Sequence, residues 1–134
     1  MIAKPFFDTN VLIYALAQND PRAGKAEELL ADGGIVSVQS FNEFVAVARR
    51  KLAMSWKEVK DFLDQICVLC PDPVSISMDT HKTALQVAEK YGYGIYDALL
   101  ISAALKSGCR ILFSEDLQDG QNINRQLTIR NPFR

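Results

Sequence analysis

Short apolar runs alternate along this chain with stretches in which apolar residues recur at the three- and four-residue spacing of helices. Runs typical of short buried strands occupy residues 3–7, 35–38, 74–78, 110–113 and 127–130. Strands that alternate with helices favour a mainly parallel sheet that is covered on both faces. We therefore expect an α/β fold, a three-layer α/β/α sandwich with a mainly parallel sheet of about five strands.

Local signals at the ends of these segments refine the expected elements. Pro5 in the first run indicates that this strand lies near a sheet edge or begins its pairing late. Ser40 is expected to cap the helix that follows the second strand, and Glu43 stands at capping-box spacing from it. The same spacing recurs from Ser55 to Glu58, where no chemistry is in sight.

The segment that begins near Asp97 predicts a different kind of helix. It is apolar on nearly every side as far as Lys106, and Gly108 is expected to stop it. Such a helix leaves little polar surface for water, and its small alanines permit close approach to a sheet. We expect it to be central in the fold.

Composition bounds the class of protein. The 134 residues, 49% of them hydrophobic, suffice for one compact core, so residues 1–134 are expected to form a single domain. With 15 basic and 16 acidic residues, the net charge of -1 indicates neither a strongly basic nucleic-acid-binding surface nor an acidic tail. The chain contains no apolar run of signal-peptide or membrane-spanning length, and three cysteines make no disulfide framework. We expect a cytoplasmic protein with no membrane partner.

Two features that often carry chemistry are weak here. Cys67 and Cys70 form a Cys-x-x-Cys pair, but the pair lies at the end of a helical pattern and no second Cys or His pair accompanies it. His81 is the only histidine, which excludes a His-rich metal centre.

Four acidic residues have a common placement in the predicted fold. Asp8, Glu43, Asp97 and Asp116 each follow a strand-like run or lie at the opening of a helix-like one. Because the carboxyl ends of parallel strands share one edge of a sheet, these four side chains are expected to meet. Clustered carboxylates repel one another unless a hard cation neutralises them, so the pattern predicts a site for Mg²⁺ or Mn²⁺.

Each of these acids also has a structural interpretation. Asp8 and Asp97 would serve as helix caps, Glu43 as the acid of a capping box, and Asp116 as a turn residue. Four such coincidences in this order are less probable than one shared site. Glu115 and Asp119 are poorer candidates, although Asp119 could replace or assist Asp116.

The same positions carry a resemblance to a known family. The chain resembles a PIN domain, most closely the VapC-type toxin ribonucleases of bacterial toxin–antitoxin pairs, in the order and spacing of its motifs. The matching segments are Phe6-Phe7-Asp8-Thr9-Asn10-Val11-Leu12-Ile13-Tyr14, Asn42-Glu43, Tyr96-Asp97-Ala98-Leu99-Leu100-Ile101-Ser102-Ala103-Ala104 and Ser114-Glu115-Asp116-Leu117. Haloacid-dehalogenase-like phosphatases fit less well because they need a second aspartate where this chain has Asn10. Receiver domains would need paired acids near the end of the first strand and a lysine after a late strand.

The resemblance implies that Asp8, Glu43, Asp97 and Asp116 hold one or two Mg²⁺ or Mn²⁺ ions and that the substrate is RNA. Metal ions can activate a water and stabilise charge on the phosphate oxygens, so phosphodiester hydrolysis requires no histidine or cysteine. Thr9, Asn10 and Ser114 are candidate donors to the carboxylates. The resemblance further implies a cognate antitoxin protein and a homodimer.

Three other groups of residues have candidate roles in binding. The basic residues that could contact RNA phosphates are Arg49, Arg50, Lys51, Arg22, Lys25 and Arg110. The tyrosines that could stack on bases are Tyr14, Tyr93 and Tyr96, and the aromatic residues that could form an interface are Phe41, Phe44 and Trp56. Packing and solvation explain each group at least as well. Two rival functions stay open, a noncatalytic PIN-like binding module and a metal-dependent phosphatase.

Overall fold

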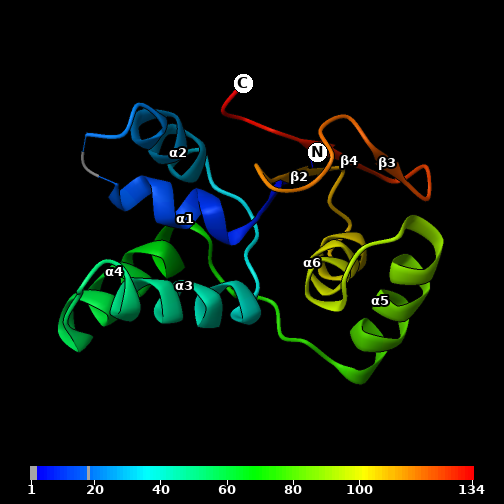
Figure 1. Ribbon diagram of the computed structural model, residues 1–134, viewed down its shortest axis with the longest axis horizontal. Helices are drawn as coiled ribbons and strands as arrows, with labels where there is room; N and C mark the ends of the chain where they lie inside the picture. The colour runs from blue at the N-terminus through cyan, green and yellow to red at the C-terminus, as the bar shows by residue number, and fades with distance from the viewer. Residues whose placement is uncertain (1–2, 18) are drawn as a thin grey trace.

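The computed structural model describes residues 3–17 and 19–134, and their helices and strands follow one another as Figure 1 shows. In chain order the elements are β1 (Phe6–Phe7), α1 (Thr9–Leu16), α2 (Arg22–Ala31), α3 (Val38–Arg50), α4 (Trp56–Leu69), α5 (Met78–Tyr91), α6 (Ile95–Lys106), β2 (Ile111–Phe113), β3 (Asn122–Ile123) and β4 (Leu127–Arg130).

The sheet is mainly parallel, as expected. Its four described strands run in the order β1-β2-β4-β3, with β1, β2 and β4 parallel and β3 antiparallel to β4. Beyond β1 the pairing continues only as isolated parallel bridges, from Phe6 to Ile35 and from Ser37 to Val74. The chain thus has the predicted α/β class with a slightly smaller sheet than predicted.

The strands expected at residues 35–38 and 74–78 are therefore wrong in extent. In both places a serine ends the extended segment early by capping a helix. Ser37 accepts the N–H of Ser40 at 3.0 Å, so that α3 begins at Val38, and Ser77 accepts the N–H of Thr80 at 3.1 Å at the start of α5. The prediction that Ser40 caps α3 is wrong for the same reason.

The first strand lies inside the sheet, and its pairing begins late, as Pro5 allowed. Phe7 N–H donates to Ile35 O at 3.0 Å on one side, while β2 pairs with the other side. Gly34 permits this approach, because a Cβ placed there would lie 2.4 Å from the Phe7 ring and 2.8 Å from Pro5 O. Asp8 directly follows β1 and therefore lies at the carboxyl end of a strand that is paired on both sides.

The two residues of β1 divide the core. Phe6 packs with the residues of α5, α6, β2 and β4 that form one buried cluster, whereas Phe7 packs with residues of α1 to α4 in the other. Successive side chains of a strand point to opposite faces, so the two clusters lie on the two sides of the sheet. Figure 1 shows α1 to α4 gathered on one side of the molecule and α5 with α6 on the other, which gives three layers.

Helix α6 is as buried as its composition predicted. Most of its residues from Ala98 to Ala104 are excluded from solvent, and the hydroxyl of buried Ser102 donates to Thr80 O at 2.8 Å. Among the described helices, none combines the length and the apolarity needed to cross a membrane.

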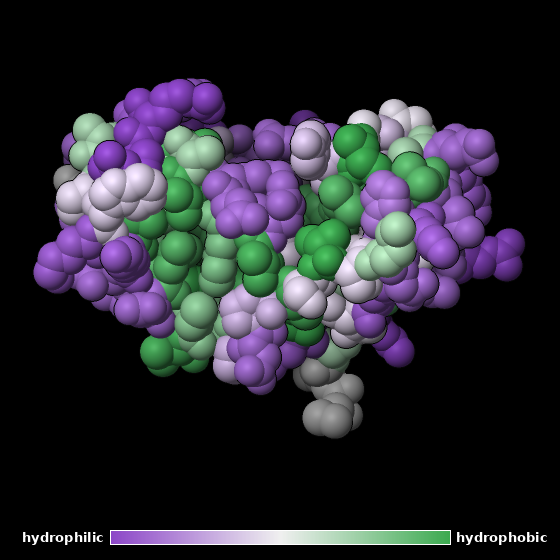
Figure 2. Space-filling view, turned by 90° about the horizontal axis from the view of Figure 1, so that it is seen from below, coloured by the Kyte–Doolittle hydropathy of each residue, from purple (hydrophilic) through white to green (hydrophobic). Residues whose placement is uncertain are grey.

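The proposed interface aromatics separate into core and surface. Phe44 is fully buried and stacks on Phe62 with ring centroids 4.8 Å apart, so it belongs to the core. Trp56 is 55% exposed, and the Arg49 guanidinium lies 4.3 Å from its ring centroid. Figure 2 views the side of the molecule that carries α3, α4 and α5, and shows exposed apolar side chains among polar ones there.

Candidate metal-binding site

Asp8 is the most enclosed acid of the candidate site, with 7% of its surface exposed. It follows β1 directly and is the N-cap of α1, where Oδ1 accepts the N–H of Thr9 at 2.6 Å. The other oxygen, Oδ2, accepts the Ser114 hydroxyl at 2.7 Å and Asn10 Nδ2 at 3.4 Å. The cap interpretation of Asp8 is therefore correct, and it also fixes the orientation of this carboxylate.

Glu43 has a partner outside its own helix. Its Oε2 accepts the hydroxyl of Thr9 at 2.8 Å, and Oε1 accepts Gln39 Nε2 at 3.5 Å. Because α3 begins at Val38, Glu43 lies beyond the first turn. The capping-box interpretation of Glu43 is thus wrong, whereas the Ser55–Glu58 capping box is present.

Asp116 lies in the loop after β2 and is joined to Asp8 through two side chains. Asn10 Nδ2 lies 3.3 Å from Asp116 Oδ2 and 3.4 Å from Asp8 Oδ2, so one amide group bridges the two carboxylates. Ser114 Oγ accepts the N–H of Asp116 at 3.2 Å while its own hydroxyl donates to Asp8. Asn10 and Asp8, which lie 106 and 108 positions before Asp116 in the sequence, thereby come close to it.

Asp97 belongs to the same electrostatic cluster. It is the third residue of α6, whose N-cap is Gly94, so the expectation that Asp97 caps the helix is wrong. Desolvation raises the pKa of Asp97 above its usual range, and the negative charges of Asp116 and Glu43 raise it further. The charges of two of the other three acids therefore act on Asp97.

Asp8 shows the same influences more strongly. Burial is the largest cause that raises its pKa, to about 6, and the charges of Asp116 and Glu43 add to it. Hydrogen bonds from Ser114 and Thr9 lower the pKa and offset part of the rise. Asp8 and Asp97 are thus both influenced by the charges of Glu43 and Asp116.

The two alternative acids are engaged elsewhere. Asp119 accepts the N–H of Asn131 at 2.9 Å and lies 3.8 Å from Arg134, in the C-terminal segment. Glu115 accepts hydrogen bonds from Tyr14 and Arg22. Asp116 is thus the acid of this loop that joins the cluster.

The residues fit a hard divalent cation by their chemistry. All four charged donors are carboxylates, the ligand type that Mg²⁺ and Mn²⁺ prefer, and their mutual repulsion is what a cation would relieve. Asn10 Oδ1 is buried and, among the described residues, has no hydrogen-bond partner. In the described part of the chain no three of these carboxylates are arranged as a complete set of metal ligands.

Among the described residues, none of the basic candidates forms a hydrogen bond or ion pair with these four acids. Arg22 is hydrogen-bonded to Asp20 and Glu115, and Arg49 donates to Met54 O at 2.7 Å. Arg110 precedes β2, whereas Asp116 follows it, so the two lie toward opposite ends of that strand. The Arg22–Glu115 contact is a feature that sequence patterns did not predict, because it joins residues 93 positions apart.

The tyrosine candidates also differ in their surroundings. Tyr14 donates to Glu115, and burial together with this bond raises the pKa of Tyr14 to about 12. Tyr93 donates to Gln121. Tyr96 precedes Asp97 and is 65% exposed.

Comparison with known proteins gives a family and a fold. A family model described as the PIN domain matches residues 6–118. No curated protein matches the chain.

Three solved structures share the fold at low sequence identity. One is a toxin–antitoxin complex from Klebsiella pneumoniae, with a TM-score of 0.72 and 19% identity over 96% of this chain and 98% of that one. VapC20 of Mycobacterium tuberculosis, described as a Sarcin-Ricin loop cleaving toxin, has a TM-score of 0.65 and 18% identity over 84% and 91% of the two chains. VapBC2 of Rickettsia felis, bound to a DNA fragment from its promoter, has a TM-score of 0.68 and 20% identity over 98% of each chain.

Proposed function

Since the chain belongs to the PIN-domain family, we propose that it is a single-domain endoribonuclease that uses Mg²⁺ or Mn²⁺ to hydrolyse RNA phosphodiester bonds. The observation that carries this proposal is the set of hydrogen bonds through which Thr9, Asn10 and Ser114 link the acids. They connect Asp8 with Glu43 of α3 and with Asp116 after β2. A cluster held in this way serves no packing purpose, because like charges held close together, one of them on the buried Asp8, destabilise a fold.

In this proposal Asp8, Glu43, Asp97 and Asp116 hold one or two ions. When bound, such ions supply an activated water and neutralise charge on the phosphate and the leaving oxygen. The contribution of the chain is orientation. Thr9 and Ser114 hold the carboxylates of Glu43 and Asp8, which leaves fewer side-chain rotations to be fixed when a cation binds.

The protonation state of Asp8 also affects cation binding. With a pKa of about 6, this carboxyl group takes up a proton in mildly acidic solution, and a cation must displace that proton. Cation binding is therefore expected to weaken as the pH falls below about 6.

The proposed biological role is that of a toxin in a toxin–antitoxin pair, acting in the cytoplasm as a homodimer. Its support is the fold shared with the Klebsiella pneumoniae, Mycobacterium tuberculosis and Rickettsia felis structures. Co-purification with the product of an adjacent gene that encodes a short DNA-binding protein tests the antitoxin partner. The oligomeric state is read from light scattering of the purified chain.

The enzymatic proposal is tested with purified protein, RNA and Mg²⁺ or Mn²⁺. Asp8→Asn and Asp97→Asn are each expected to reduce cleavage by at least about a hundredfold, because each removes a charged ligand. Asp119→Asn is the matched control, since its carboxylate bonds to Asn131 and not to the cluster. It is expected to retain activity within about threefold.

The outcomes separate the rival functions. RNA cleavage that survives both Asp8→Asn and Asp97→Asn contradicts the proposed site. Hydrolysis of small phosphomonoesters without RNA cleavage favours a phosphatase, which the same carboxylates could serve. Cation binding with neither activity favours a noncatalytic module.

A further inference from the structure

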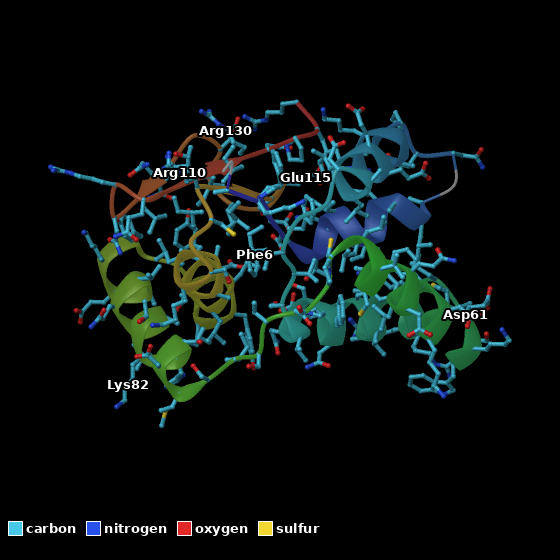
Figure 3. The ribbon with its side chains drawn as sticks, turned by 180° about the vertical axis from the view of Figure 1, so that it is seen from behind. Phe6, Asp61, Lys82, Arg110, Glu115 and Arg130 are labelled. Carbon is cyan, nitrogen blue, oxygen red and sulfur yellow. The ribbon has the colours of Figure 1, made fainter. Side chains whose placement is uncertain are left out.

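A second group of polar residues borders the metal-binding site. Tyr14 of α1, Asp20, Arg22 of α2 and Glu115 form what we call the Arg22 cluster. Glu115, labelled in Figure 3, belongs to the loop after β2 and immediately precedes Asp116. The Arg22 cluster thus joins the α1–α2 region to the loop that carries one of the four acids.

Arg22 uses its whole guanidinium group in this cluster. Nε and Nη2 donate to the two oxygens of Asp20 at 2.9 and 2.7 Å. Nη1 donates to both oxygens of Glu115 at 3.2 Å and to the Tyr14 hydroxyl at 2.7 Å. The guanidinium carbon also lies 3.9 Å from the centroid of the Tyr14 ring. Only a planar fork of donors can make this set of contacts at once, so lysine cannot replace it.

The Asp116 loop therefore has two anchors. The inner anchor is Ser114, which donates to Asp8 and accepts the N–H groups of Asp116 and Leu117 at 3.2 and 3.3 Å. The outer anchor is Glu115, held by Tyr14 and Arg22. The side chain of Asp116 itself has one hydrogen bond among the described residues, from Asn10 at 3.3 Å, so the two anchors determine where it lies.

We propose that Arg22 is a positioning residue that, through Glu115, holds the Asp116 loop in the place required for cation binding. The inference concerning the cation rests on the proposed function, whereas the inference concerning the loop does not. Arg22 also keeps the carboxylate of Glu115 paired with a guanidinium group. A fifth free carboxylate beside Asp116 would compete for the same cation and change its coordination.

The loop is tested first, by hydrogen–deuterium exchange of the whole protein without metal. In Arg22→Lys the amides of Asp116 and Leu117 are expected to exchange about tenfold faster than in the wild type, because the outer anchor keeps the positive charge and the Tyr14 bond but loses the forked guanidinium contacts. Lys25→Gln is the matched control on the same helix. In the described contacts its side chain makes no bond to this loop, and exchange there is expected to be unchanged.

The dependence on Glu115 is tested by a double-mutant cycle. Glu115→Ala alone is expected to accelerate exchange as much as Arg22→Lys, and the double variant no more than either single one. Tyr14→Phe, which keeps its edge contact with Phe133, is expected to have a smaller effect. Effects of Arg22 and Glu115 that simply add, or exchange unchanged in Arg22→Lys, would overturn the proposal.

The consequence for the cation is measured by calorimetric titration with Mn²⁺. Arg22→Lys is expected to weaken Mn²⁺ binding about three- to tenfold with the loop exchange already raised. Faster exchange with unchanged Mn²⁺ affinity would restrict Arg22 to a structural role and overturn the proposal. A wild type whose heat of binding Mn²⁺ equals that of Asp8→Asn contradicts the proposed function instead, and the exchange experiment still decides whether Arg22 positions the loop.

Discussion

At the scale of single residues, the surroundings of Asp8 have opposing effects on its pKa. It caps α1 and accepts hydrogen bonds from Thr9 and Ser114, which favour its charged form. Burial and the charges of two neighbouring acids favour the neutral form more strongly and set the pKa at about 6, against 3.8 for an unperturbed aspartate. The ionised state that binds a cation is therefore costly to the metal-free fold.

This cost predicts a pH dependence of stability for the metal-free protein. Because the folded state holds the proton more tightly than the unfolded state, ionisation of Asp8 lowers the free energy of unfolding as the pH rises from about 4 to about 6. The difference in pKa corresponds to about 3 kcal/mol at neutral pH, as an order of magnitude. Chemical denaturation in the presence of a chelator measures it.

The variant Asp8→Asn isolates this contribution, because it removes the charge. At pH 7 the metal-free variant is expected to be more stable than the wild type by about 1 to 3 kcal/mol, and the advantage is expected to vanish near pH 4. Asp119→Asn provides the comparison for an acid outside the cluster. An advantage that is independent of pH would contradict the assigned pKa.

Sequence patterns predicted the four acids and three of the side chains that bond to them, but not the Arg22–Glu115 contact beside Asp116. Asp8, Glu43, Asp97 and Asp116 were recognisable because strand ends share an edge, and Thr9, Asn10 and Ser114 follow from their proximity to two of these positions. Glu115 was a poorer candidate from sequence, because no residue near it in the chain indicates that it contacts Arg22. A contact between side chains 93 positions apart depends on the packing of α2 against the loop, which no local pattern encodes.

At the scale of elements, two short capping segments decide how far the sheet extends. Three of the four residues from Ile35 to Val38 are apolar and β-branched, which predicts a strand, but the Ser37 cap makes Val38 the first residue of α3. The early start places Glu43 beyond the first turn of that helix, where it meets Thr9. The local interpretation that competed with a functional role for Glu43 is thereby removed.

Gly34 gives an element-scale prediction about the pairing beside β1. Gly34→Ala is expected to lower the free energy of unfolding by about 1 to 3 kcal/mol, because the new Cβ overlaps the Phe7 ring and Pro5 O. Gly24→Ala is the matched control: nothing lies within 4 Å of its Cβ position in α2, and alanine favours a helix by about 0.5 to 1 kcal/mol. Urea denaturation distinguishes the two, and equal effects would contradict the close approach at Gly34.

At the scale of the whole molecule, the four acids come from four separate parts of the chain. Asp8 ends β1, Glu43 belongs to α3, Asp97 to α6 and Asp116 to the loop after β2. A cation that binds all of them ties together both helical layers and the sheet between them. Such a ligand is expected to oppose global unfolding and not only the opening of a loop.

Binding of Mn²⁺ is therefore expected to raise the melting temperature of the wild type. The added free energy of unfolding is about 2.7 kcal/mol when the ion is present at a hundred times its dissociation constant. Asp8→Asn is expected to show little of this increase, and Asp119→Asn the full increase. A rise of equal size in Asp8→Asn would place the cation elsewhere on the protein.

The pairing of β1 with β2 also sets an order of events during synthesis. Strand β1 is synthesised about 100 residues before its parallel partner, Ile111–Phe113. At about 5 to 20 residues per second, the interval between Asp8 and Asp116 lasts roughly 5 to 20 s. Throughout that interval Phe6 and Phe7 have no β2 beside them, so a nascent chain contains no assembled acid cluster. The molecule acquires its site only after the Asp116 loop has been synthesised.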